Sequence, residues 1–349
     1  MYPRANTCWR LSPHGSGVSE FLEEAEQVAP AWSQVVELRP LGEGHIHDTY
    51  RVKRKDGSYS VLQKFNEHVF RDSELVMAQT ERLLRAWTEQ DQYTVPELLI
   101  NLAGDVTVRN ESGLWRMWRY VEGSRVVDPV SNVTQALEVG KAFAAFQVSL
   151  EAMSGEPFID PIDGFLDLGH YLDAFAEVAV RAPREARAII DAQSDVAGLL
   201  SERHCHIHGD CKVNNALFDA SEDRVAAIID FDTAMYGHWA WDFGDLVRSV
   251  CFSSGGYDAS LYQACLQGFI ENQPRANVAE AVIAPRYVTL MLGIRFLTDH
   301  LSGDQYFKVD YPGENLYRAE GQFALLREFD VNQGAMARLA EAAFGAKLG

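Results

Sequence analysis

One stretch of the chain combines residue types and spacing that suit the transfer of a phosphoryl group from a nucleotide. It reads His208-Gly209-Asp210-Cys211-Lys212-Val213-Asn214-Asn215, and Ile228-Ile229-Asp230-Phe231-Asp232 follows it. In enzymes that use a Mg-nucleotide in this way, an Asp accepts the proton of the acceptor hydroxyl, an Asn five residues later holds a metal ion, and a further Asp bridges metal and phosphates. We therefore expect Asp210 to be the general base and Asn215 and Asp230 to hold Mg²⁺.

The neighbouring sequence favours this interpretation over that of an ordinary loop, in which Asp and Asn would only satisfy backbone donors. Lys212 lies two residues after the expected base, where a cation neutralises charge on the transferring group. Strand-like segments enter the loop at Cys205 to Ile207, leave it at Ala216 to Phe218, and form a hairpin partner at Arg224 to Ile229. The oxygen-bearing side chains then converge at one end of a small sheet, and carboxylate and amide oxygens are ligands that Mg²⁺ prefers.

Length and composition suit a two-domain enzyme with a small substrate. The chain has 349 residues, more than a single hydrophobic core usually spans. Its 47% apolar and 23% charged residues are ordinary globular values. The formal charge of −19 would repel nucleic acids and anionic membranes, so we expect neither as a partner. A small-molecule substrate is easier to reconcile with this charge, and the oligomeric state stays open.

The remaining composition indicates a cytoplasmic protein. The first residues have no apolar core like that of a signal peptide, and we expect no apolar run near the ~18 residues of a membrane span. Five scattered cysteines without a CxxC pair indicate free thiols.

The hydrophobic pattern changes near residue 120, which divides the chain into an expected N-terminal lobe of residues 1–120 and a C-terminal lobe of residues 121–349. Before this point the pattern predicts strands and one helix, Ser73 to Trp87. Alternation around Lys55-Asp56-Gly57-Ser58 is a strong hairpin signal. The predicted strands are Val36 to Leu41, Thr49 to Val52, Tyr59 to Phe65, Glu97 to Ile100, Val106 to Val108 and Trp115 to Val121.

After residue 122, apolar residues recur mainly at helical spacing. The predicted helices are Val133 to Leu150, Leu166 to Val180, Ala186 to Leu200, Ala259 to Ile270, Val278 to His300 and Glu314 to Glu328. The expected fold class is therefore α+β: a protein-kinase-like two-lobed fold with a small β-rich N-lobe, a larger helical C-lobe and the nucleotide between them.

Two places in the N-terminal lobe are expected to bind ATP through the backbone. Gly42, Gly44 and His45 lie between two predicted strands, where glycines let N–H groups approach phosphates, although Gly-x-Gly also occurs in tight hairpins. Tyr120 and Glu122 end the last strand, where the adenine is expected. A simple strand end is the alternative there.

The strand before Asn66 should present a cation to the phosphates. Alternation gives that position to Gln63, and Lys64 points to the other face unless the strand bulges. We favour Lys64 as the nearest cation. Its partner in the following helix would be Glu74 or Glu81, and the sequence does not decide between them.

These motifs resemble the aminoglycoside phosphotransferase and choline kinase superfamily, and within it most of all the N-acetylhexosamine 1-kinases. The resemblance runs from about residue 40 to residue 330, and Gly209 departs from the Asn of closer members at a backbone position. The segments that carry it, besides the loop above, are Gly42-x-Gly44-His45-Ile46-x-Asp48-Thr49, Val61-Leu62-Gln63-Lys64-x-Asn66, Asp230-Phe231-Asp232-Thr233, Asp242-Phe243-Gly244-Asp245-x-x-Arg248, Leu290 to Asp299, Tyr306-Phe307-Lys308 and Asn315-Leu316-x-Arg318-x-x-x-Gln322-Phe323.

The resemblance implies an ATP- and Mg-dependent kinase of small-molecule hydroxyls, here the anomeric hydroxyl of a hexose or N-acetylhexosamine. That hydroxyl is unusually acidic, so Asp210 would suffice as base at a near-normal pKa. Arg295, inside an apolar helical run, is the candidate for binding the sugar, because unpaired buried polar groups penalise a wrong substrate. An internal ion pair of Arg295 with Asp242, Asp245 or Asp299 is the alternative. For Asp242 we favour a structural role in holding the catalytic loop.

Other interpretations stay open. The cluster of His204, Cys205, His206, His208 and Cys211 could suggest zinc, but a structural zinc site wants a second pair of ligands, and none is spaced for it. A catalytically inactive pseudokinase is disfavoured by the complete set of catalytic residues. A kinase of aminoglycosides, choline or homoserine is the main alternative, and the acidic composition suits cationic acceptors.

Overall fold

The computed structural model describes residues 17–41, 46–87, 92–151, 153, 155–252 and 257–348. The chain forms two compact units with a boundary between Ser124 and Arg125, inside a short strand, β6 (Ser124–Val126). The first unit is rich in antiparallel strands and the second is mostly helical, as the change of hydrophobic period predicts.

The N-terminal unit is built on a five-stranded antiparallel sheet in the order β1-β2-β3-β5-β4. Two helices accompany the sheet, α1 (Gly17–Val28) and α2 (Ser73–Ala86). The strands are β1 (Val35–Pro40), β2 (Asp48–Arg54), β3 (Tyr59–Lys64), β4 (Thr107–Asn110) and β5 (Gly113–Arg119).

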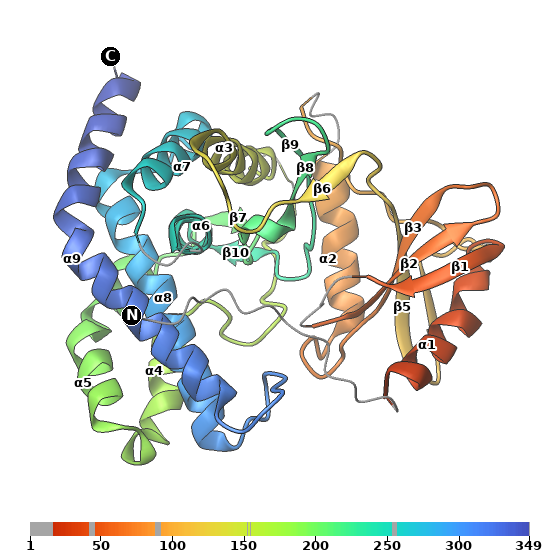
Figure 1. The fold of residues 1–349 in the computed structure, drawn as a ribbon, viewed down its shortest axis with the longest axis horizontal. Coiled ribbons are helices and arrows are strands. Elements are labelled where there is room, and N and C mark those ends of the chain that lie inside the picture. The colour runs from red at the N-terminus through yellow and green to blue at the C-terminus, as the bar shows by residue number, and fades with distance from the viewer. Residues whose placement is uncertain are drawn as a thin grey trace. The chain divides into compact units, whose positions relative to one another are not determined.

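The two faces of this sheet are covered differently (Figure 1). One face packs its apolar residues, among them Leu62 and Met117, against α1 and the turn that follows it. On the other face Arg116 of β5 contacts the sulfur of Met77 in α2. Because neighbouring residues of a strand point to opposite faces, this division decides which side chain of β3 faces which helix.

Glu97 to Ile100 does not form the predicted strand, and only Leu98 makes an isolated bridge, with Trp118. β4 occupies the first part of this edge of β5, from Gly113 to Arg116. Few residues of β5 therefore remain to pair with a further strand.

The C-terminal unit is a group of helices around two small sheets. β8 pairs with β9, and β10 pairs with β7, both antiparallel. The helices are α3 (Val133–Ser149), α4 (Leu168–Ala176), α5 (Arg184–Gln193), α6 (Trp239–Phe252), α7 (Ala259–Asn272), α8 (Val278–Ser302) and α9 (Glu314–Leu348). The strands are β7 (Cys205–Ile207), β8 (Ala216–Asp219), β9 (Val225–Ile228) and β10 (Met235–Gly237).

Two glycines let α3 and α7 lie side by side at close range (Figure 1). A Cβ atom on Gly140 would lie 2.4 Å from the carbonyl oxygen of Cys265, and one on Gly268 would lie 2.1 Å from that of Leu137. Both distances are far below van der Waals contact, so any larger residue would separate the helices.

α8 is the one helix of the described residues that is long and apolar enough to cross a membrane, and 67% of its most apolar window is buried inside the structure. Such burial is typical of a core helix. The expectation of no apolar run of this length is therefore corrected. Arg286 and Arg295 interrupt the run in the sequence.

The helical pattern locates most helices but not all their ends. α4 and α5 stop before the predicted Val180 and Leu200, and 3₁₀ turns follow each of them. α9 continues to Leu348, beyond the predicted Glu328. α6 escaped prediction because its first nine residues are all buried, so that it shows no amphipathic stripe.

Candidate active site

The catalytic loop, defined here as His208 to Asn215, lies between β7 and β8. The hairpin of β8 and β9 brings Asp230 to it, because Ala216 pairs with Ile228 and the amide of Ile229 donates to the carbonyl oxygen of Asn215 at 2.9 Å. Asp230 follows directly after that contact. The predicted convergence of the loop and Asp230 therefore has a structural basis in the hairpin register.

Asp210 lies at the centre of a hydrogen-bonded cluster. Its Oδ2 is 2.9 Å from Nζ of Lys212 and accepts a hydrogen bond of 3.0 Å from Nδ2 of Asn215. The same Nδ2 donates to the backbone oxygen of Asp210 at 2.9 Å. The structure thus brings together three residues that the sequence singled out.

The charges of this cluster influence the protonation state of Asp210. Burial alone would raise the pKa of Asp210, but the charge and hydrogen bond of Lys212, with contributions from His208 and Asn215, hold it below its ordinary value. Burial would lower the pKa of Lys212, but Asp210, followed by Asp230 and Asp245, raises it. The two groups are therefore ionised together, and the near-normal pKa expected for Asp210 is corrected downwards.

The donor atoms around Asn215 suit a magnesium ion. Because Nδ2 of Asn215 donates twice to Asp210, its Oδ1 is turned away and accepts no hydrogen bond from the residues that the structure describes. Asp230 has a φ of 70°, a left-handed conformation in which Asp is tolerated better than most residues. An amide oxygen and a carboxylate are hard oxygen donors, which fits Mg²⁺.

Two polar side chains of α6, Asp242 and Ser249, accept hydrogen bonds from backbone amides of the catalytic loop. Asp242 accepts hydrogen bonds of 2.8 Å from the backbone amides of His208 and Gly209, and it also accepts one of 2.7 Å from Nε2 of Gln147 in α3. Ser249 accepts a hydrogen bond of 3.0 Å from the amide of Val213. The structural role favoured for Asp242 is confirmed, whereas Ser249 was missed because a lone serine in a buried helix carries no motif.

Gly209 occupies a position that demands glycine. Its φ is 82°, and a Cβ atom would lie 2.3 Å from the carbonyl oxygen of Thr233. The hydroxyl of Thr233 also donates to the backbone oxygen of His208 at 3.0 Å, which holds the two segments together. A residue with a side chain would need a wider gap here.

A second charged pair lies near the loop. Nε and Nη2 of Arg248 both donate to Oδ1 of Asp245, at 2.9 and 2.7 Å. Burial raises the pKa of Asp128, although Lys212 and Arg248 lower it. Lys212 therefore interacts electrostatically with Asp128 and Asp245 as well as with Asp210.

Arg295 lies in an aromatic cage formed by Phe165, Tyr171, Tyr306 and Phe307. Its guanidinium carbon is 5.1 to 5.5 Å from the four ring centroids. Its one hydrogen bond goes from Nη2 to the hydroxyl of Tyr306 at 3.3 Å. Within the described part of the chain it makes no ion pair, so the alternative of an internal pair with Asp242, Asp245 or Asp299 is corrected.

The cage is assembled by hydrogen bonds to its supporting loops. Asp299 accepts from the backbone amides of Tyr306 and Phe307 at 2.8 and 2.9 Å. On the other side, the hydroxyl of Tyr287 donates to the backbone oxygen of Leu166, whose φ of 62° turns the chain beside Phe165. The cage therefore depends on segments that are far apart in sequence.

The structure describes only some of the residues that are expected to bind ATP in the N-terminal unit. Gly42, Gly44 and His45 lie outside the described residues, and their phosphate-binding role stays a prediction. Tyr120 follows β5 with its ring 6.0 Å from that of Tyr59, and Glu122 is exposed in the next turn. Their adenine-binding role also stays a prediction.

Lys64 lies on the α1 face of the sheet. Its Nζ is 2.6 Å from Oε2 of Glu24 in α1 and 5.6 Å from the ring centroid of Trp115. The pairing of β3 with β2 and β5 shows no bulge that would turn it to the other face. The proposed helix partners also differ, because Glu74 pairs with Arg109 and Glu81 with Arg85. These contacts correct the preference for Lys64.

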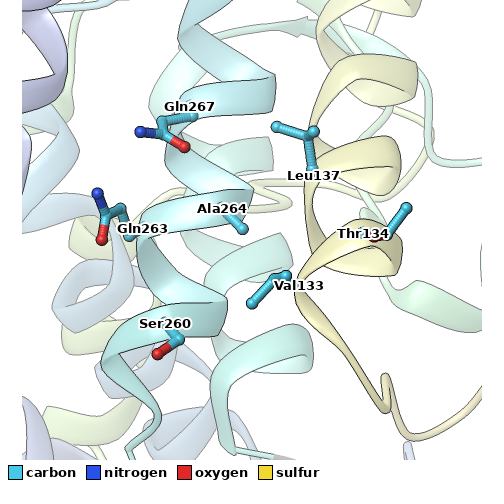
Figure 2. Close-up of a pocket in the computed structure, with 7 residues that line it drawn as sticks. All are labelled: Val133, Thr134, Leu137, Ser260, Gln263, Ala264 and Gln267. Atoms are coloured by element: carbon cyan, nitrogen blue, oxygen red, sulfur yellow. The ribbon is translucent and has the colours of Figure 1, made fainter.

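A hollow between α3 and α7 is lined by none of the candidate catalytic residues (Figure 2). It measures about 330 Å³ and contains no acid, base or thiol. The residues that line it are Val133, Thr134, Leu137, Ser260, Gln263, Ala264 and Gln267. We therefore place the candidate active site at the catalytic loop.

No cluster of three or more His, Cys, Asp or Glu side chains that could hold a metal occurs among the described residues. The histidines of the suggested zinc site have separate surroundings. The ring of His208 packs against Phe146, that of His206 against Phe158, and that of His204 against His238.

Comparison with known proteins finds a matching family and similar folds. The model of a phosphotransferase enzyme family, APH, matches residues 37–277. A choline/ethanolamine kinase family protein from Mesorhizobium loti has a similar structure, with 18% sequence identity and a TM-score of 0.64, over 95% of this chain and 99% of that chain.

Two further solved structures are similar at 14% identity and a TM-score of 0.62. One is the GDP complex of aminoglycoside 2'-phosphotransferase-IIIa, aligned over 89% of this chain and 99% of that chain. The other is an amicoumacin kinase in complex with AMP-PNP, Ca²⁺ and Ami, aligned over 89% and 92%. At these identities the similarity shows the fold, and it confirms the predicted kinase-like fold class.

Proposed function

The chain belongs to the phosphotransferase enzyme family, and from this premise we propose that it is an ATP- and Mg-dependent kinase that phosphorylates the anomeric hydroxyl of a hexose or N-acetylhexosamine. The observation that carries the transfer chemistry is the cluster of Asp210, Lys212 and Asn215 within hydrogen-bonding distance of one another. The sugar acceptor rests on the sequence resemblance and on the Arg295 cage.

In the proposed reaction, Asp210 accepts the proton of the acceptor hydroxyl. The acceptor oxygen forms a bond to the terminal phosphorus while the bond from that phosphorus to the ADP oxygen breaks. Lys212, held beside Asp210, stabilises the negative charge of the transferring group. The products are a sugar 1-phosphate, ADP and the proton taken up by Asp210.

Asn215 and Asp230 would hold Mg²⁺, with Oδ1 of Asn215 and the carboxylate of Asp230 as ligands. When bound, Mg²⁺ would neutralise charge on the phosphates. Of the solved relatives, the amicoumacin kinase is described with a nucleotide analogue and a divalent ion, which supports both requirements.

The low pKa of Asp210 bears on the choice of acceptor. A carboxylate whose pKa is held down by Lys212 is a weak base. An anomeric hydroxyl compensates for this, because the ring oxygen withdraws electron density and makes the hydroxyl more acidic than that of an ordinary alcohol. The pairing of weak base and acidic hydroxyl favours a reducing sugar.

The Arg295 cage offers what a sugar needs, namely flat aromatic surfaces and unused N–H donors. Its single hydrogen bond to Tyr306 leaves most of its five N–H groups available for the acceptor. The same positive charge would repel a cationic acceptor such as an aminoglycoside or choline. We therefore rank those acceptors below a neutral sugar, despite the acidic composition.

Two experiments test this function. The first measures ATP consumption with a panel of free sugars, amines and amino alcohols, and we expect turnover with a hexose or N-acetylhexosamine. Preference for a cationic amine would replace the sugar proposal by the alternative.

The second experiment compares the free sugar with its methyl glycoside, in which the anomeric oxygen is blocked. We expect no phosphorylation of the glycoside, and phosphorus NMR should place the new ester at carbon one. An ester at another carbon would contradict the anomeric assignment while leaving a small-molecule kinase.

A further inference from the structure

The position that the strand pattern assigns to a phosphate-facing cation is occupied by Gln63. Gln63 and Lys64 are consecutive in β3, and the regular pairing of β3 puts their side chains on opposite faces of the sheet. Lys64 is held on the α1 face by Glu24. Gln63 is paired across the sheet with Thr49 of β2 on one side and Arg116 of β5 on the other.

The orientation of the Gln63 amide is fixed by two donors. Its Oε1 accepts hydrogen bonds from Nε of Arg116 at 3.0 Å and from Nε1 of Trp118 at 2.8 Å. Because both partners can only donate, the oxygen must face them and the NH₂ group must face away. That group is 3.4 Å from the hydroxyl of Thr49, a long contact that engages at most one of its two hydrogens.

Arg116, which donates to Gln63, is buried and packed between aromatic rings. Its residue is 1% exposed, and its guanidinium carbon lies 4.4 Å from the ring centroid of Phe65 and 5.0 Å from that of Trp118. A buried positive charge that donates to Oε1 polarises the amide and makes its N–H groups better donors. The positive charge thus acts through Gln63, which is itself partly exposed.

We propose that Gln63 donates a hydrogen bond to a nucleotide phosphate, with Arg116 as the positioning residue that orients and polarises its amide. The proposal rests on the proposed ATP-dependent function and names the N-terminal contact that this function requires. It replaces the lysine expected at this place by a neutral donor that is hydrogen-bonded to a buried cation.

The decisive variant is Gln63→Glu. A carboxylate still accepts from Arg116 and Trp118, so the fold is kept, but the outward N–H donors are lost and a negative charge faces the phosphates. We expect the affinity for ATP, measured by titration calorimetry with Mg²⁺, to fall at least about tenfold, which corresponds to the loss of one hydrogen bond to a charged group. Adenosine affinity should not change, because adenosine has no phosphate.

Lys64→Leu is the matched control, one residue away on the opposite face. It should bind ATP and adenosine as the wild type does. Equal ATP affinity of Gln63→Glu and wild type, or a selective loss of ATP affinity in Lys64→Leu, would overturn the proposal. If the wild-type protein binds no ATP at all, the proposed function fails as well, so the two failures can be told apart.

The role of Arg116 is tested by a double-mutant cycle. Arg116→Gln alone should weaken ATP binding, but it should add little in a Gln63→Leu background, because the amide on which it acts is gone. Fully additive losses would assign Arg116 a structural role only. Circular dichroism of each variant checks that the fold is intact before affinities are compared.

Discussion

The catalytic loop and the Arg295 cage hold positive charge in opposite ways. In the loop, Lys212 lies 2.9 Å from the carboxylate of Asp210, and two further carboxylates, Asp230 and Asp245, raise its pKa. In the cage, Arg295 faces four aromatic rings and makes one long hydrogen bond, without an ion pair among the described residues.

This difference separates a part whose charged groups pair with one another from a part whose guanidinium has no ion-pair partner among the described residues. The loop satisfies its own charges and holds the side chains of Asp210, Lys212 and Asn215 in place. The cage positions a guanidinium by ring contacts and leaves its donors unused, which suits a group whose partner is the substrate. Substitutions in the loop should therefore affect the rate, and substitutions in the cage should affect acceptor affinity.

The largest effect is expected from Asp230→Ala, which removes a carboxylate from the proposed metal site. Turnover should be abolished while adenine binding remains detectable, because this group acts chiefly on charge that develops during transfer. Coupled-assay kinetics together with calorimetric titration of ADP measure both properties. Normal turnover of the Asp230→Ala variant would exclude Asp230 as a required metal ligand.

Asp210→Asn comes next, because it keeps the shape of the base but cannot accept a proton. We expect turnover to fall by roughly 10²–10⁴, the usual range for loss of a general base. KM for both substrates should change little. A wild-type rate in this variant would mean that another group takes the proton.

Lys212→Met probes the charge balance within the loop. Turnover should fall by about 10²–10³, as for other groups that stabilise transition-state charge. Its pH profile gives a second readout. Without Lys212, burial is the main influence left and raises the pKa of Asp210, so the acid limb of kcat/KM should move to higher pH. An unchanged acid limb would show that Lys212 does not control the pKa of Asp210.

Arg295→Ala tests the cage. KM for the acceptor should rise about 10- to 100-fold through the loss of charge-assisted hydrogen bonds, while KM for ATP stays near the wild-type value. Arg295→Lys keeps the charge without the planar fork and should recover only part of the affinity. A loss of turnover without a change in acceptor KM would place Arg295 with the loop and remove the contrast between the two regions.

The smallest effect is expected from Tyr306→Phe, which removes one hydrogen bond to Arg295 but keeps the ring. Acceptor KM should rise about two- to fivefold, in line with one neutral hydrogen bond. If Tyr306→Phe matches Arg295→Ala in a side-by-side measurement, the hydroxyl and not the guanidinium makes the main contact.

The contrast also explains what the sequence could predict. The catalytic loop was predictable because Asp210, Lys212 and Asn215 are close in sequence, and a single hairpin places Asp230 beside them. The identity of the fold followed from the change from strand to helix period. Lys64 shows that a residue next to the expected position can still face away from it. Strand alternation already assigned Lys64 to the other face, and the structure shows Glu24 as its partner there.

The cage lay beyond prediction, since its rings come from separate segments, and only the packing of α4 and α8 and the caps of Asp299 and Tyr287 bring them to Arg295. α6 was missed for another reason. Its first nine residues are all buried, so this part shows no polar stripe that would reveal the helical period, although Asp242 within it accepts hydrogen bonds from the loop.

The hydrogen bonds from α6 to the catalytic loop have a consequence for its motions. Loops usually exchange their amide hydrogens quickly, because local opening costs little free energy. Here the amides of His208, Gly209 and Val213 donate to side chains of a buried helix. Their exchange with deuterium should therefore require α6 to move away, which would make this segment, although irregular in backbone, part of the same cooperative unit as the helical core.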